Sequence, residues 1–214
     1  MFRKWFLSRS IVCTAVLAVV LYAVPVHAVP VLDFGTGIDG TGGTITPGAT
    51  ITGSGILIGT LNVIGTTAMD GVYDVSGAGV GTSGSTALLS FAYDGGGTNW
   101  LTIVGGISSL GVADGTTLLS GLFTSLTYLP SLGIMASGVD TKDPGLLTAL
   151  GISPTTPFEL FGFSIGFDPS PTGGAITALS TDIKNTAVPE PGTLLLLGSG
   201  LTALGLLGRK VRKA

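Results

Sequence analysis

The chain has almost none of the side chains on which most enzyme chemistry depends. Its 214 residues include one cysteine, Cys13, and one histidine, His27, and both fall in the first 28 residues. Between residues 29 and 187 there is no cysteine, histidine or arginine. That stretch therefore has no intrachain disulfide, no His/Cys zinc site and no Ser-His or Cys-His nucleophile pair. We predict a protein that is not an enzyme, with no catalytic residues and no metal ligands.

Charged residues are also scarce and unevenly placed. They make up 10% of the chain, against about 25% in an average soluble protein. All twelve acidic residues lie between Asp33 and Glu190, where the only basic residues are Lys142 and Lys184. The remaining basic residues lie near the two ends. An acidic body repels phosphate backbones, so we expect no nucleic-acid partner.

Residues 1–28 have the pattern of a secretory signal peptide. An apolar run covers residues 11–24, and Pro25 follows it. Val26 and Ala28 then form a small-x-small cleavage site for signal peptidase, which predicts a mature chain that begins at Val29. The positive residues before the apolar run are Arg3, Lys4 and Arg9.

Residues 188–214 combine three features in a fixed order. The tripeptide Pro189, Glu190 and Pro191 comes first, and its prolines keep the chain extended and outside any following helix. An apolar run over residues 193–207 comes next; it is short for a hydrocarbon core of about 30 Å, but flanking basic side chains can snorkel. The chain closes with basic residues that the positive-inside rule places in the cytoplasm: Arg209, Lys210, Arg212 and Lys213.

This order resembles the PEP-CTERM sorting signal. In that family an exosortase recognises the tripeptide and removes the helix and basic tail, which implies that Pro189, Glu190 and Pro191 are recognition residues here. Gly192-Thr193 follows, where the family often has Ser or Thr directly. The resemblance implies a precursor held transiently in the inner membrane and a product at the cell surface or in an extracellular matrix. The implied partners are signal peptidase, exosortase and exopolysaccharide.

Residues 29–187 are predicted to form one β-rich extracellular body with glycine-rich turns. Within 158–167, Phe161, Phe163, Ile165 and Phe167 share one face of a strand. The expected fold is all-β: a single β-sandwich or jelly-roll-like body, flanked by an N-terminal signal helix and a C-terminal transmembrane sorting helix. The predicted strands are 51–58, 71–75, 86–93, 100–104, 117–126, 158–167 and 175–183, with one short helix, 144–151, that Asp143 caps.

The aspartates of the body support two interpretations. Asp39, Asp70, Asp94 and Asp114 each precede a glycine, a combination typical of hairpin turns. Their carboxylates are also suited to Ca²⁺, the one cofactor that we consider. Glycoside hydrolysis would need two carboxylates across one cleft, and no partner for Glu159 can be placed from the sequence.

The aromatic residues of the body form a last candidate site. Trp100, Tyr73, Tyr93 and Tyr128 are suited to stacking against sugars, although aromatic strand residues more often pack in a core. The predicted function is therefore a secreted, exosortase-sorted structural or adhesive protein of the surface or biofilm matrix. The alternative is a polysaccharide- or calcium-binding extracellular module.

Overall fold

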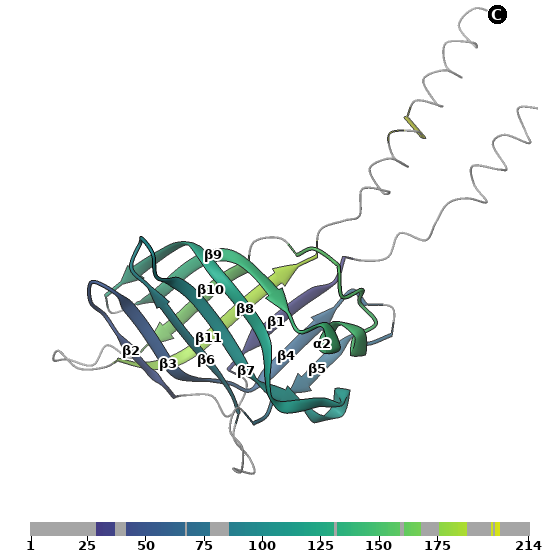
Figure 1. Cartoon of the computed structure of the whole chain (residues 1–214), viewed down its shortest axis with the longest axis horizontal. Helices are drawn as coiled ribbons and strands as arrows, with labels where there is room; N and C mark the ends of the chain where they lie inside the picture. Colours follow the sequence, from purple (N-terminus) through teal and green to yellow (C-terminus); the bar gives the residue numbers. More distant parts are fainter. Residues whose placement is uncertain are drawn as a thin grey trace, which may run out of the picture.

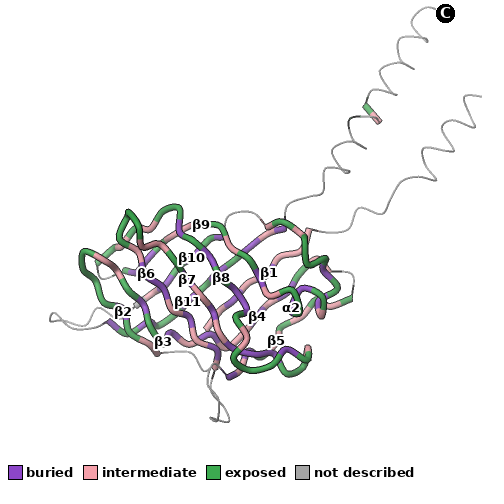
Figure 2. Tube along the Cα trace, viewed as in Figure 1, coloured by how far each residue is buried: buried purple, intermediate pink, exposed green. Residues whose placement is uncertain are grey.

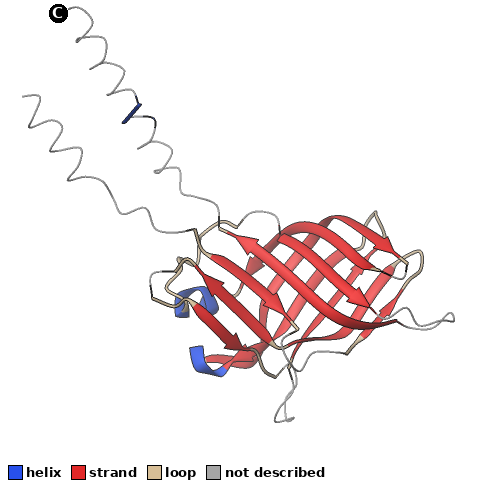
Figure 3. Ribbon diagram, turned by 180° about the vertical axis from the view of Figure 1, so that it is seen from behind, coloured by secondary structure: helices blue, strands red, loops and turns tan. Residues whose placement is uncertain are grey.

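The computed structural model describes residues 29–36, 42–66, 68–77, 86–130, 132–158, 161–167, 176–187, 198, 200 and 201. Most of these residues belong to β-strands, as Figure 3 shows. The described elements in chain order are β1 (Val31–Gly35), β2 (Thr44–Thr46), β3 (Ile51–Ile58), β4 (Thr60–Ile64), β5 (Gly71–Asp74), β6 (Ala87–Tyr93), β7 (Asn99–Ile107), the 3₁₀ turn η1 (Ser108–Leu110), β8 (Val112–Leu129), β9 (Gly133–Lys142), α2 (Pro144–Ala149), β10 (Phe161–Phe167) and β11 (Ile176–Thr186).

The antiparallel sheet closes into a barrel (Figure 1). Eight strands follow one another in the order β10-β9-β8-β7-β6-β3-β2-β11, and β10 also pairs with β11, which completes the ring. The edge of the long strand β11 that faces away from β10 pairs with two strands. Its first residues pair with β2, and its second half pairs with β1. Beyond β1, the sheet continues through β4 and β5.

The closed ring means that the expected β-sandwich or jelly-roll is not confirmed, whereas an all-β body is. A sandwich keeps two sheets whose edge strands stay unpaired. Here β10 joins the two ends of the sheet through its pairings with β9 and β11. Both architectures place every second side chain inside, so alternation in the sequence cannot distinguish them.

Apolar side chains pack across the interior of the barrel. Phe91 of β6, Phe123 of β8 and Phe163 of β10 contact one another edge to face, with ring centroids 5.5–5.9 Å apart. Since β6 and β10 are not neighbours in the ring, the contact between Phe91 and Phe163 spans the interior. Each such pair contributes about 0.5–1.5 kcal/mol beyond its buried area. Figure 2 shows buried and exposed residues alternating along the strands.

Each of the seven predicted strands overlaps an observed one, and 51–58 coincides with β3. The predicted apolar face of β10 is confirmed where the structure describes it, because Phe161, Phe163 and Ile165 are at most 3% exposed. The prediction missed β1, β2, β4 and β9. The predicted helix is present as α2, and the Asp143 side chain accepts a hydrogen bond from the Leu146 backbone N at 2.8 Å.

Candidate functional site

The two ends of the body lie side by side. In the β1–β11 ladder, Val31 pairs with Thr186, and the backbone N–H of Ala187 donates to the carbonyl of Pro30 at 2.8 Å. The predicted sorting tripeptide starts two residues after Ala187, and two residues of extended chain span about 7 Å. The segments next to both predicted processing sites therefore leave the barrel at the same end.

The processing residues themselves lie outside the described part of the chain. These are Val26 and Ala28 at the signal cleavage site, Pro189, Glu190 and Pro191 in the sorting motif, and Arg209, Lys210, Arg212 and Lys213 in the basic terminus. Of the apolar run 193–207, the structure describes residues 198, 200 and 201. Among the described helices, none has the length and apolar character needed to cross a membrane.

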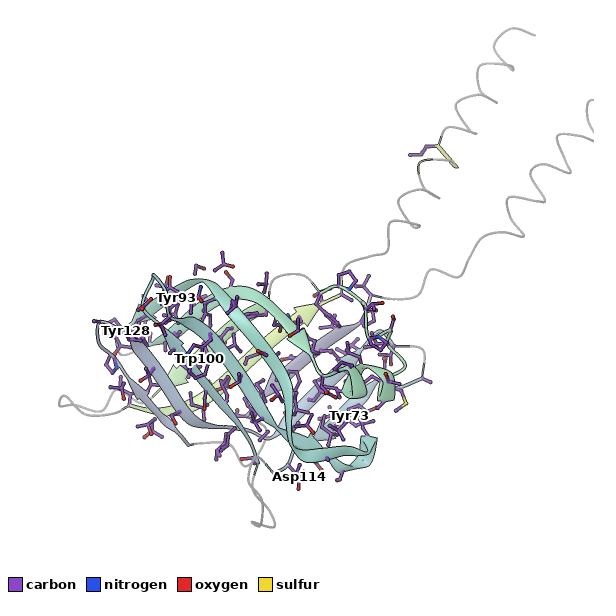
Figure 4. All side chains as sticks on the ribbon, in the orientation of Figure 1. Tyr73, Tyr93, Trp100, Asp114 and Tyr128 are labelled. Carbon is purple, nitrogen blue, oxygen red and sulfur yellow. The ribbon has the colours of Figure 1, made fainter. Side chains whose placement is uncertain are left out.

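The four aromatic candidates do not form one platform (Figure 4). Trp100 points outward and is 41% exposed. Tyr93 lies opposite Asn99 in the ladder, so its side chain is on the other face of the sheet, where it contacts Phe123. Tyr128 also packs against the core. Tyr73 lies toward the other end of the body, and its hydroxyl donates to the Met69 carbonyl at 2.7 Å.

Trp100 instead belongs to an exposed apolar row that crosses three strands. In the register of β7, β8 and β9, Trp100 lies opposite Leu122 and Leu122 lies opposite Val139. Leu122 and Val139 are 52% and 53% exposed. Large apolar side chains gathered on an exposed sheet face often indicate a contact surface.

Hydroxyl side chains border this row on both sides. One border consists of Thr102, Ser120 and Thr141, which lie opposite one another in the ladder. The other consists of Ser125 and Ser137, whose hydroxyls are 3.0 Å apart. We call these eight residues the neutral face, because none of them is charged: Trp100, Thr102, Ser120, Leu122, Ser125, Ser137, Val139 and Thr141.

Two of the four Asp-Gly pairs make the predicted turns. Asp94 accepts hydrogen bonds from the backbone N–H groups of Gly96 and Thr98, which lower its pKa, in the hairpin between β6 and β7. Asp70 accepts from the hydroxyl and N–H of Thr66 before β5, and these bonds lower its pKa. Asp114 differs from the prediction: it lies within β8 and accepts from the Ser76 hydroxyl at 3.0 Å.

Within the described part of the body, carboxylates do not gather into a metal-binding group. Among the described residues, no three His, Cys, Asp or Glu side chains come close enough together to hold an ion. Asp39 and Glu159, the other carboxylates singled out in the sequence, lie outside the described residues.

An acidic pair lies on the outer face of β1 and β11. Burial, with a hydrogen bond and repulsion from Asp182, raises the pKa of Asp33 to about 7. Lys184, which lies opposite Asp33 in the ladder, acts in the other direction. The environment of the half-buried Asp33 therefore suits it to exchange a proton near neutral pH.

Sequence reasoning missed a polar group inside the barrel. Asp140 and Lys142 are two residues apart on β9, and both side chains lie on its inner face. Both side chains are fully buried, and Lys142 Nζ lies 2.5 Å from Oδ1 of Asp140. Asn185 of β11, which is 1% exposed, donates from Nδ2 to the same oxygen at 3.3 Å. We call these three residues the buried triad. The available signal was the Asp-x-Lys spacing, which places both charges on one face of a strand.

Comparison with known proteins identifies the C-terminal segment. Residues 187–213 match the family model for the PEP-CTERM protein-sorting motif, and this range contains Pro189, Glu190, Pro191 and the basic terminus. No curated protein and no solved structure matches the chain. The motif implies recognition by an exosortase and export to the cell envelope or surface. The chain therefore carries a PEP-CTERM protein-sorting motif over residues 187–213.

Proposed function

We propose that this protein is a non-catalytic structural or adhesive component of an extracellular matrix, and that the neutral face binds a neutral polysaccharide of that matrix. The observation that carries the proposal is the exposed row of Trp100, Leu122 and Val139 between two borders of hydroxyl side chains. The ladders between β7, β8 and β9 hold these side chains on one continuous surface.

The chemistry of the neutral face suits sugars that carry no charge. A pyranose ring has an apolar C–H face, which packs against an aromatic ring, and hydroxyls at its edge, which exchange hydrogen bonds with Ser and Thr side chains. The body has far more acidic than basic residues. It therefore repels an anionic polymer, and a neutral one is the better partner.

The proposed binding needs neither a cofactor nor a catalytic group. Asp70 and Asp94, two of the carboxylates considered for Ca²⁺, already accept hydrogen bonds within their own turns. Contact with a polymer through many copies of a weak site would give a matrix protein its avidity. The route to the matrix begins with signal peptidase and a transient stay in the inner membrane.

Affinity electrophoresis of the secreted protein in gels that contain the neutral polysaccharide of its host tests this proposal. We expect Trp100→Ala to weaken binding by about 2- to 10-fold, the equivalent of an aromatic contact of about 0.5–1.5 kcal/mol. Binding should persist in EDTA. Ile64→Ala is the matched control, because Ile64 is 53% exposed on β4, outside the neutral face. Equal retardation of the Trp100→Ala and wild-type proteins would contradict the proposal.

A further inference from the structure

The buried triad brings an amine, an amide and a carboxylate together in an apolar interior. Lys142 Nζ and Asn185 Nδ2 both lie within hydrogen-bond distance of one oxygen, Oδ1 of Asp140. The amine and the amide are therefore no farther apart than the sum of those two distances. Lys142 and Asn185 belong to β9 and β11, the two strands on either side of β10.

Apolar groups and a glycine surround the triad. The ring of Phe158 lies 4.1 Å from Lys142 Nζ, measured to the ring centroid. In the β8–β9 ladder, Lys142 lies opposite the fully buried Leu119, and Asp140 lies opposite Gly121. A Cβ at position 121 would lie 3.0 Å from the Cβ of Asp140, so the glycine leaves room for the carboxylate.

The hydrogen bonding of the triad is incomplete for a structural ion pair. Asp140 Oδ2 and Asn185 Oδ1 are buried, and neither has a hydrogen-bond partner among the described residues. A buried ion pair is stable when further hydrogen bonds satisfy its remaining lone pairs. The protein groups described around the triad therefore do not complete the hydrogen bonding that a structural ion pair needs.

We propose that Lys142 and Asn185 form an intramolecular amide bond, with Asp140 as the acid-base group of the reaction. The Nζ lone pair of Lys142 forms a bond to Cγ of Asn185. One Nζ proton passes through the Asp140 carboxyl to Nδ2, the Cγ–Nδ2 bond breaks with its electron pair on nitrogen, and ammonia leaves. The step starts from the neutral Lys142 amine and the protonated Asp140 carboxyl, which gives one proton to Nδ2 and regains one from Nζ, and nothing is oxidised or reduced.

The electrostatics of the site support this chemistry. Burial lowers the pKa of Lys142, which favours the neutral amine needed for attack, although Asp140 opposes this effect. Burial likewise raises the pKa of Asp140 against the attraction of Lys142. A proton transfer from Lys142 to Asp140 therefore produces a nucleophile and a general acid, and the general acid is hydrogen-bonded to the amide of Asn185.

The bond would tie β9 to β11 across β10, where the barrel closes. Asn185 lies two residues before Ala187, and the sorting segment follows. A force that pulls on the C-terminal end of the body would then act on a covalent crosslink rather than on β-ladder hydrogen bonds alone. Such a tie suits a protein that holds a matrix together.

Peptide mass spectrometry of the native protein after trypsin digestion tests the bond. Trypsin does not cleave after an acylated lysine, so we expect no peptide that ends at Lys142. We expect instead a branched peptide that joins Lys142 to Asn185 and is lighter by one ammonia, about 17 Da, than its unlinked parts. Asp140→Ala and Asn185→Ala should each restore cleavage after Lys142. Lys184→Arg, at an exposed lysine next to Asn185, is the control and should keep the branched peptide.

Full cleavage after Lys142 in the wild-type protein would overturn the proposal, and that result requires no variant to fold. Loss of one ammonia with cleavage after Lys142 intact would also overturn it, because a succinimide at an asparagine gives the same mass change without a crosslink. A branched peptide whose crosslink joins any pair other than Lys142 and Asn185 would also overturn the proposal.

Discussion

At the scale of single residues, three described carboxyls of the body lie in different environments. Asp94 and Asp70 are exposed, and hydrogen bonds from their turns lower their pKa values. Asp33, on the outer face of β1, has its pKa raised by burial and by Asp182. The pKa values of aspartates in one body are therefore shifted in opposite directions.

Stability should fall as the pH rises from about 4 to about 7, in part through Asp33. In the unfolded chain this carboxyl loses its proton near the ordinary aspartate pKa of 3.8, whereas in the folded protein its pKa is about 7. The native state binds more protons in that window, so the free energy of unfolding decreases as pH rises. Asp33→Asn should flatten this decrease, measured by denaturant unfolding across the window.

Asp94→Asn provides the control for this pH profile. The pKa of Asp94 is lowered, so Asp94 titrates below the window, and its removal should leave the slope between about pH 4 and pH 7 unchanged. An unchanged slope in Asp33→Asn would show that Asp33 is not the titrating group.

At the scale of elements, glycines in two strands let aromatic rings approach the backbone closely. A Cβ at Gly53 of β3 would lie 2.1 Å from the ring of Phe91. A Cβ at Gly138 of β9 would lie 2.1 Å from the Leu122 carbonyl oxygen and 2.7 Å from the ring of Phe161. These glycines determine where the large rings of the core can pack.

Gly138→Ala should therefore destabilise the barrel. Overpacking of a core costs about 1–3 kcal/mol, and one of the two close neighbours is a backbone oxygen that cannot rotate away. Gly162→Ala is the matched change, because Gly162 lies on the exposed face of β10 with no atom within 4 Å of its added Cβ. Thermal unfolding of both variants measures the difference, and equal melting temperatures would contradict the packing argument.

At the scale of the whole molecule, the closed barrel leaves its two ends together. The bond between Ala187 and Pro30 joins the first and last described segments of the body. The described chain therefore enters and leaves the barrel at neighbouring points.

Glu190→Ala should leave unprocessed precursor in the membrane fraction, because the substitution removes the only charge from the sorting tripeptide. Cell fractionation with immunoblotting measures the ratio of precursor to product. Glu159→Ala changes the only other glutamate of the chain and serves as the control, with normal release expected. Release of Glu190→Ala at the wild-type rate would mean that Glu190 is not needed for recognition.

The sequence by itself determined those features that depend on neighbouring residues. The sorting motif at residues 187–213 is a local pattern of proline, charge and hydropathy, so the order of its residues is enough to recognise it. The alternation in β10, the cap of α2 by Asp143 and the turn at Asp94 follow from the same local chemistry. The strand β9 was missed, because its Ser, Gly, Asp and Lys residues weaken the apolar pattern.

Only the tertiary structure decided how those strands pair and what the pairings bring together. Closure of the barrel depends on the pairing of β11 with β10 along one edge and with β2 along the other. The hydrophobic periodicity of the sequence predicts neither pairing. The neutral face arises from the register of three strands. The buried triad joins residues 45 positions apart, Asp140 and Asn185, through a hydrogen bond across the interior. Such contacts follow from the shape of the closed sheet, because sequence spacing specifies which face a side chain occupies but not which distant strand it meets.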